Sequence, residues 1–194
     1  MARDVEGTKR KILDAALVEF AAHGPDGTTI DRIAKQAGVN KERIYNYFGD
    51  KYQLFATVLE GELAKVAQAV PVESFASENI GEYAGRVYDY HRTRPELTRL
   101  MRWEGLTFDG EVPDEAHRRE YYRRKSAAVA AGQEAGVLTT AIDAEYLTFL
   151  VLSLAGWWSA VPQVARMLTG PESDAEHARR RAAVVAAAQR LANA

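Results

Sequence analysis

The sequence predicts an all-α protein, and three observations carry that prediction. Apolar residues recur at the three- and four-residue spacing of one helix face along most of the chain. No run alternates apolar and polar residues with the β-branched enrichment that would favour a sheet. Proline is sparse, with 6 among 194 residues, so long helices are readily accommodated.

Four helices are expected in the N-terminal part of the chain, at about residues 8–23, 30–37, 41–48 and 51–70. A turn that contains glycine follows each of the first three and interrupts the apolar pattern. Thr28 or Thr29 is the expected N-cap of the second helix, and Asn40 is the expected N-cap of the third.

Five further helices are expected in the C-terminal part, at about residues 80–91, 95–108, 114–135, 143–168 and from 173 to the C-terminus. Pro95 suits the first turn of the helix at residues 95–108, and Gly136 ends the helix at residues 114–135. We place the boundary between a small N-terminal domain (1–50) and a larger C-terminal domain (51–194) at the Gly49-Asp50 helix junction.

The composition excludes several classes of protein. Apolar residues make up 47% of the chain and charged residues 27%, which is ordinary for a globular protein. The absence of cysteine excludes thiolate nucleophiles, disulfides and cysteine-bound metal. The N-terminus lacks an apolar signal core, and the most apolar run, Tyr146–Val161, is shorter than the roughly 20 residues that span a bilayer. We therefore expect a cytoplasmic protein without membrane contact.

Residues 33–44 combine the features of a helix-turn-helix. Gly38 can adopt the positive φ that a sharp turn between helices requires. Ala34 is small where the two helices approach each other, and Ile44 returns to a core shared with Ile33 and Val39. These residue types at these offsets are the geometry of a helix-turn-helix.

The helix after this turn is short and mostly polar. Lys41, Arg43 and Asn46 can bond base edges or phosphates, and the hydroxyls of Tyr45 and Tyr47 can reach phosphates. A helix of this size fits the major groove of DNA. The alternative is a tight antiparallel helix pair with a solvated charged face.

Charge alone does not favour DNA as a partner. The formal net charge of the chain is −2, and residues 1–60 contain as many acidic as basic residues. Binding to DNA therefore has to come from segregated cations, at residues 9–11 and 41–51.

The flanking residues extend the pattern, and the sequence resembles the tetracycline-repressor (TetR) family of regulators over roughly Thr8–Phe55. The resemblance rests on an ordered set of motifs: Thr29-Ile30-Asp31-Arg32-Ile33-Ala34, Ala37-Gly38-Val39, Ile44-Tyr45-Asn46-Tyr47-Phe48, Lys51 and Leu54-Phe55. It implies a three-helix DNA-binding domain followed by a helical domain for ligand binding and dimerisation. It also implies a homodimeric repressor that binds a palindromic operator and is released by a small-molecule effector.

The resemblance implies a set of DNA-contacting residues. Thr29 would contact phosphate at the start of the second helix, and Lys51 would hold a phosphate at the start of the fourth. The third helix and its cap would supply contacts to bases and to the DNA backbone from Asn40, Lys41, Arg43, Tyr45, Asn46 and Tyr47.

Two positions depart from the family pattern. Family members often have a small hydroxyl residue where Asn40 stands, although asparagine caps a helix equally well. Glu42 is acidic in a helix that is meant to approach an anion. It can accept a hydrogen bond from cytosine N4 or pair with a neighbouring cation, so this departure bears on the operator sequence.

Aromatic residues are concentrated in the C-terminal helices, where they can line an apolar ligand pocket or simply form the core. His91 and Glu104 stand on apolar helix faces, and a polar group there needs a partner from the protein or from a ligand. The candidate ligand-binding residues are Tyr88, His91, Met101, Glu104, Phe108 and Trp157.

The resemblance also implies that the last two helices pair with their copies in a four-helix dimer interface. Small residues of the last helix would allow close approach, unless they pack within the chain: Ala175, Ala178, Ala182, Val185 and Ala186. The basic clusters at residues 118–119, 123–125 and 179–181 are interpreted as solvated helix faces.

No enzymatic motif is evident. The chain has no paired histidines at metal-ligand spacing, no glycine-rich phosphate loop and no nucleophile elbow. The stretch Asp114-Glu115-Ala116-His117 is interpreted as the start of a helix rather than a metal cluster, so we expect no metal and no cofactor. The alternative to a DNA-binding regulator is a helical small-molecule-binding protein without DNA function.

Overall fold

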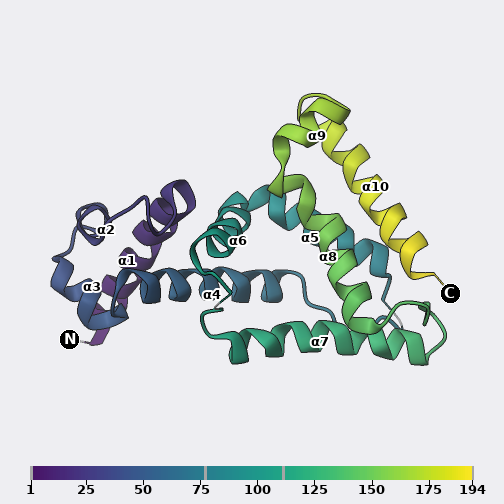
Figure 1. Cartoon of the computed structure of the whole chain (residues 1–194), viewed down its shortest axis with the longest axis horizontal. Coiled ribbons are helices and arrows are strands. Elements are labelled where there is room, and N and C mark those ends of the chain that lie inside the picture. Colours follow the sequence, from purple (N-terminus) through teal and green to yellow (C-terminus); the bar gives the residue numbers. More distant parts are fainter. Residues whose placement is uncertain (1, 77, 111, 194) are drawn as a thin grey trace. The chain divides into compact units, whose positions relative to one another are not determined.

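The computed structural model describes residues 2–76, 78–110 and 112–193 (Figure 1). Over these ranges the chain forms ten α-helices and no β-strand, which confirms the predicted all-α class. The helices are α1 (Ala2–His23), α2 (Ile30–Ala37), α3 (Lys41–Phe48), α4 (Lys51–Ala69), α5 (Ile80–Thr93), α6 (Pro95–Thr107), α7 (Glu115–Glu134), α8 (Ala144–Ala160), α9 (Pro162–Thr169) and α10 (Asp174–Ala192).

The helix boundaries agree with the sequence prediction at α2 and α3 and lie within two residues of it at most other helix ends. They differ by more at two places. α1 begins at Ala2, about two turns before the expected start at Thr8. The prediction of one helix over residues 143–168 is wrong, because α8 ends at Ala160 and α9 begins at Pro162, with a bend of 85° between them. Pro162 has no N–H to continue the ladder of α8, whereas the first position of a new helix needs none.

Among the described residues, no single helix has the length and hydropathy needed to cross a membrane. The pair α8 and α9 reaches both only when taken together, across their bend.

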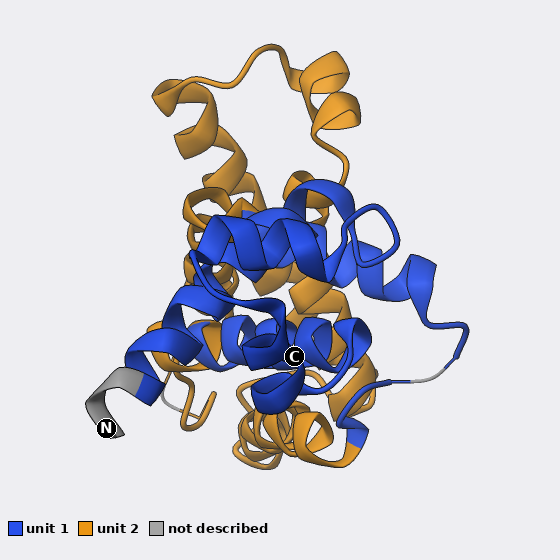
Figure 2. Ribbon diagram, turned by 90° about the vertical axis from the view of Figure 1, so that its left-hand side faces the viewer, with its two compact units in different colours: residues 1–65, 96–115 blue, residues 66–95, 116–194 orange. Residues whose placement is uncertain are grey.

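The chain divides into two compact units (Figure 2). Unit 1 comprises Met1–Lys65 and Glu96–Glu115, and unit 2 comprises Val66–Pro95 and Ala116–Ala194. The expected domain boundary at Gly49-Asp50 lies inside unit 1. α6 is grouped with the N-terminal helices, although some thirty residues of unit 2 separate it from them in the sequence.

The core of unit 1 is built from one apolar face of each N-terminal helix. The side chains of Phe20 (α1), Ile33 (α2) and Ile44 (α3) have no exposed surface, and neither has Phe55 (α4). The rings of Phe20 and Phe55 meet edge to face, with centroids 5.3 Å apart. This contact joins α1 to α4, and α2 packs against both α1 and α3.

α6 packs directly on the N-terminal helices of unit 1. Phe108, just after α6, lies 5.8 Å from the ring of Phe55 and 6.0 Å from that of Tyr52, between centroids. The indole of Trp103 covers Gly24, where an added Cβ would stand 2.6 Å from the ring. Gly24 also has a φ of +69°, so the turn after α1 requires glycine on both counts.

Unit 2 is organised around α5, which packs against α8 and α10. Tyr83, Val87 and Tyr88 of α5 are buried with residues of α7, α8 and α10 in one apolar cluster. Glycine at position 81 lets α10 approach closely, because a Cβ there would stand 2.7 Å from the carbonyl oxygen of Val185. Of the small residues expected at a dimer interface, Val185 therefore serves packing within the chain.

The interpretation of all basic clusters as solvated faces is wrong at two positions. Arg180 is only 7% exposed, and it donates to Glu176, to the Thr169 hydroxyl and to the Gly170 carbonyl. Arg118 is also buried, at 8% exposure. Arg180 thus donates to a carbonyl and a hydroxyl oxygen at the C-terminal end of α9, where a helix leaves carbonyl groups without an intrahelical donor.

Candidate nucleic-acid interface

The turn between α2 and α3 has the geometry that its sequence predicts. Gly38 adopts a left-handed conformation, with φ 66° and ψ 36°, and the Val39 N–H donates to the Ala34 carbonyl at 3.0 Å. This six-to-one bond satisfies a carbonyl that the end of α2 leaves free. Ala34 is buried beside the turn, as its small size predicts.

Both helices of the motif are capped by polar side chains. The Thr29 hydroxyl accepts from the Arg32 N–H at 3.3 Å, and the Asn40 side chain accepts from the Glu42 N–H at 3.4 Å. These caps fix the first turn of each helix with its remaining N–H groups directed outward. Thr29 and Asn40 are themselves exposed, so both can also meet a phosphate.

α3 is anchored on one side only. Ile44 is fully buried, whereas Tyr47 and Phe48 are half-buried. The remaining side chains are exposed, and they are polar or carry a polar tip: Lys41, Glu42, Arg43, Tyr45 and Asn46. The helix therefore presents one hydrogen-bonding face to the surroundings, which is the property that reading DNA in the major groove requires.

The cations of this region differ in their partners. The Lys41 ammonium pairs with Asp31 of α2 at 3.1 Å, and this hydrogen bond raises the pKa of Lys41. Arg43 has no ion pair within the part of the chain that the structure describes. Lys51 is half-buried at the start of α4 and donates to the Thr28 carbonyl at 3.5 Å. Both cations of α3 are exposed, but among the described residues only Lys41 is paired with an acidic side chain.

Two family models match the chain. Residues 12–58 match the model of bacterial regulatory proteins of the tetR family, and residues 79–190 match that of the tetracyclin repressor-like C-terminal domain. The chain belongs to the TetR family. It is therefore a helix-turn-helix transcriptional regulator, as the resemblance predicts.

Individual relatives agree with this assignment. The TetR-family chain is 49% identical over 170 residues to the HTH-type transcriptional repressor SCO4008 of Streptomyces coelicolor, covering 87% of each protein. It is 31% identical over 156 residues to the HTH-type transcriptional regulator RutR of Escherichia coli K12, covering 77% of this chain and 72% of RutR. The crystal structure of SCO4942 of Streptomyces coelicolor superposes with a TM-score of 0.82 at 32% identity, over 95% of this chain and 98% of that one.

The candidate effector residues of this TetR-family chain are divided between the units. Met101, Glu104 and Phe108 belong to unit 1, and Tyr88, His91 and Trp157 belong to unit 2. Phe108 packs on α4 as described above, and Met101 is 40% exposed. Their role in binding an effector stays a prediction.

Within unit 2, the three candidates have different surroundings. Tyr88 is buried and stacks on His177 of α10, with ring centroids 4.9 Å apart. His91 is half-buried, and its burial lowers its pKa. Trp157 is 64% exposed on the outer side of α8, so it faces away from the core of unit 2.

Sequence reasoning missed a polar cluster that joins α5 to α10. Asp89 accepts from Arg181 at 2.8 Å and lies 2.9 Å from His177 Nε2. Arg181 also donates to Glu82 at 3.0 Å. The acceptors are about ninety residues distant in the chain, so periodicity within α10 carries no signal for them.

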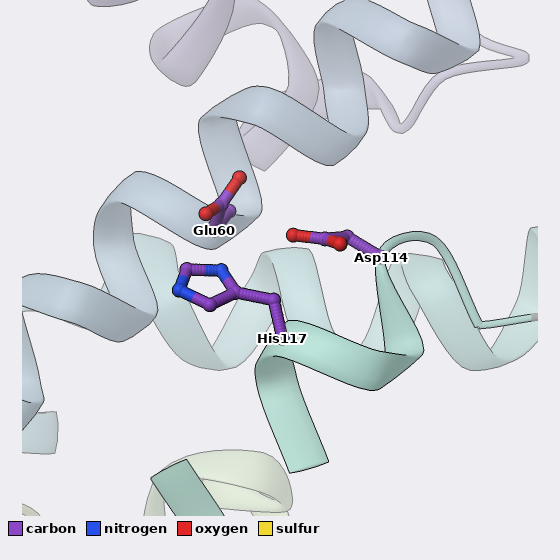
Figure 3. A group of neighbouring side chains, drawn as sticks. All are labelled: Glu60, Asp114 and His117. Atoms are coloured by element: carbon purple, nitrogen blue, oxygen red, sulfur yellow. The ribbon is translucent and has the colours of Figure 1, made fainter. Parts of the chain in front are cut away.

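The stretch Asp114–His117 forms a helix start, as predicted, since α7 begins at Glu115. Asp114 lies beside Glu60 of α4 within unit 1 (Figure 3), and carboxylate oxygens of the two residues lie within 4.8 Å of each other. His117 follows Asp114 by three residues in the chain. Asp114 and His117 are exposed, and exposed groups of this kind are common without a metal. We assign no metal to them.

Proposed function

We propose that the chain is an effector-responsive repressor that binds a palindromic operator as a homodimer, with α3 of each protomer in the major groove. The observation that carries this proposal is the capped α3, anchored by buried Ile44 and polar over the rest of its surface. The curated relatives, which are transcriptional repressors and regulators, support a non-enzymatic role. Such a regulator acts in the cytoplasm, where its operator is.

The proposed DNA contacts fall into two groups. Contacts to the DNA backbone come from the helix caps and from residues at the edge of α3: Thr29, Asn40, Tyr45, Tyr47 and Lys51. Tyr47 is half-buried with Lys9 5.9 Å from its ring centroid, which supports a bracing role. Lys41, Arg43 and Asn46 are exposed on α3 and offer donors to base edges and phosphates.

The proposed dimer uses the outer faces of α8 and α10. α8 exposes Tyr146, Phe149 and Trp157 to 66%, 70% and 64%. α10 exposes three alanines that permit close approach: Ala175, Ala178 and Ala182. An apolar face of this kind gains free energy when a second copy covers it. A dimer that binds half-sites one helical turn apart needs its two α3 helices about 34–36 Å apart.

We propose that the effector acts on DNA binding through α6. Within unit 1, Trp103 covers the turn after α1 and Phe108 packs on α4. The hydroxyl of Tyr52, whose ring meets Phe108, donates to Asp26 of the same turn at 2.7 Å. A displacement of α6 therefore reaches the helix-turn-helix through two contacts, and an effector that prefers one position of α6 shifts the DNA-binding equilibrium.

The test is selection of bound sequences from random double-stranded DNA by the purified full chain, with and without candidate effectors. The proposal expects one two-fold symmetric site with half-sites about one helical turn apart, and a mass of the free protein equal to two chains. Recovery of sequences without symmetry or enrichment would overturn it, as would a monomer that binds the selected site with undiminished affinity.

A further inference from the structure

The outward face of α3 has a definite centre. At about 100° per residue, Glu42 and Asn46 each lie about 160° from the buried Ile44, one on either side. Arg43 and Tyr45 lie about 100° from it, on the flanks of the helix, and Lys41 lies only about 60° from it. Glu42 and Asn46, one turn apart, are therefore the side chains that point most directly away from the protein.

The surroundings of these residues agree with that geometry. Lys41, near the buried side, reaches back to Asp31 of α2 at 3.1 Å. Glu42 makes no ion pair and no side-chain hydrogen bond within the part of the chain that the structure describes. Its carboxylate is exposed, and only its backbone N–H is used, by the cap Asn40. Among the described residues, no cation is in contact with the Glu42 carboxylate. Lys41 pairs with Asp31, and the charge of Glu42 makes only a lesser Coulombic contribution to raising the pKa of Lys41.

A carboxylate at the centre of a DNA-reading face restricts the base that it can meet. Guanine presents only acceptors in the major groove, thymine presents an acceptor and a methyl group, and adenine presents an acceptor beside its donor. Cytosine presents the N4 amino group alone and no acceptor. An ionised carboxylate accepts hydrogen bonds and donates none, so cytosine is the base that it tolerates best. Asn46 has the donor and acceptor that bind adenine at N7 and N6.

We infer that Glu42 and Asn46 are the specificity-determining pair of α3, and that they read a cytosine and an adenine in each half-site. One helical turn advances about 5.4 Å and one base pair about 3.4 Å, so the two bases lie one or two base pairs apart. This inference rests on the proposed function. It assigns Arg43 and Tyr45, on the flanks, to the walls of the groove rather than to its floor.

The experiment compares sequence selection by the wild type, Glu42→Gln, Asn46→Ala and a control, Glu134→Gln. Glu134 is an exposed acid near the end of α7, and its substitution removes the same charge with the same change of shape. Glutamine binds adenine in the bidentate manner, so Glu42→Gln should move one position of each half-site from cytosine toward adenine, by between about 5- and 150-fold. Asn46→Ala should relax the preference for adenine at a position one or two base pairs away.

The outcomes separate this inference from the proposed function. If the wild type selects no symmetric site, both fall together. If the wild type selects a symmetric site and Glu42→Gln keeps every base preference while binding all sequences more tightly by one factor, only the inference falls. That pattern would mean that Glu42 faces phosphates, whose repulsion does not depend on sequence. A changed preference in the Glu134→Gln control would also overturn the inference.

Discussion

α3 and α8 each turn one face away from the core of its unit, and the two faces are chemically opposite. α3 exposes Lys41, Glu42, Arg43 and Asn46, whereas α8 exposes Tyr146, Phe149 and Trp157. Both helices obey the same rule on their inner side, where branched or small apolar residues are buried. The difference between the outer faces is therefore not required for folding, and it indicates that the two helices bind different kinds of partner.

Each face suits one kind of partner. The hydrogen-bonding groups of α3 are well solvated in water and gain only from a partner that offers matched acceptors, donors and negative charge. The exposed side chains of α8 gain from any partner that removes them from water, at roughly 25 cal/mol per Å² of buried apolar surface. A polar substitution on α8 should therefore weaken the dimer, and an alanine substitution on α3 should weaken DNA binding. The reverse pattern would contradict this assignment of partners to the two faces.

The largest effect is expected from removing both cations of α3. Lys41→Ala with Arg43→Ala deletes four charges from a dimer, so operator affinity should fall by at least about a hundredfold while the protein stays dimeric. Gel-shift titration and sedimentation measure the two quantities. Arg123→Ala with Arg124→Ala removes the same charge from α7 and should leave operator affinity unchanged. Equal operator affinity of the α3 variant and the wild type contradicts the prediction.

The next effect is expected on α8. Phe149→Glu places two carboxylates in the proposed interface of a dimer, and the dissociation constant of the dimer should rise by at least about a hundredfold. Operator binding then weakens because each monomer meets a single half-site, and it should recover at high protein concentration. The control is Ala127→Glu, which adds the same charge to an exposed position of α7. A dimer of unchanged stability would remove α8 from the interface.

The two helices also differ in how far the sequence predicts them. The bounds of α2 and α3 follow from local chemistry, because Thr29, Gly38 and Asn40 act within one turn of where they stand. At the end of α8 the apolar pattern continues through the bend, and only Pro162 marks the break. Proline marks helix starts as well as breaks, so the apolar pattern alone favours one helix where the structure has two.

Long-range contacts account for the remaining differences. Glu176 stands four residues before Arg180, and this spacing within one helix predicts their ion pair. The Gly170 carbonyl, which also accepts a hydrogen bond from Arg180, lies at the end of another helix, so the spacing does not predict it. The contact of Trp103 with Gly24 joins segments nearly eighty residues apart. The spacing of apolar residues along α6 therefore does not predict that α6 packs in unit 1. For the same reason it does not predict the surroundings of the effector residues proposed on α6.

A smaller effect sharpens the account of α3. Asp31 holds the Lys41 ammonium, so Asp31→Asn should free this cation and raise the affinity for non-specific DNA by about two- to fivefold. The salt dependence of binding should steepen, because one more cation per protomer displaces counterions. Fluorescence anisotropy with a DNA duplex that lacks the operator, at several salt concentrations, measures both. Asp14→Asn, which removes an exposed acid of α1, serves as the control. An unchanged salt slope would mean that Lys41 does not approach DNA.

The smallest effect distinguishes the inner from the outer face of α8. His91 of α5 lies against Gly156 of α8, where an added Cβ would stand 3.6 Å from Nε2, and burial lowers the pKa of His91. The unfolded chain therefore takes up a proton on His91 at a higher pH than the folded chain does. Its contribution to stability is complete above the ordinary histidine pKa of about 6.5 and declines as the pH falls below that value.

His91→Gln should thus lose less stability than the wild type between pH 7.5 and pH 5, because glutamine does not titrate. Urea unfolding at the two pH values measures that difference for each protein, and the other histidines cancel in the comparison. Ser153→Ala, on the outer face of α8, should retain the full pH dependence of the wild type. If His91→Gln also retains it, the imidazole is as readily protonated in the folded chain as in the unfolded one. The inner face of α8 would then be open to water at His91. The inner and outer faces of α8 would in that case differ less in solvent exposure than the burial of His91 indicates.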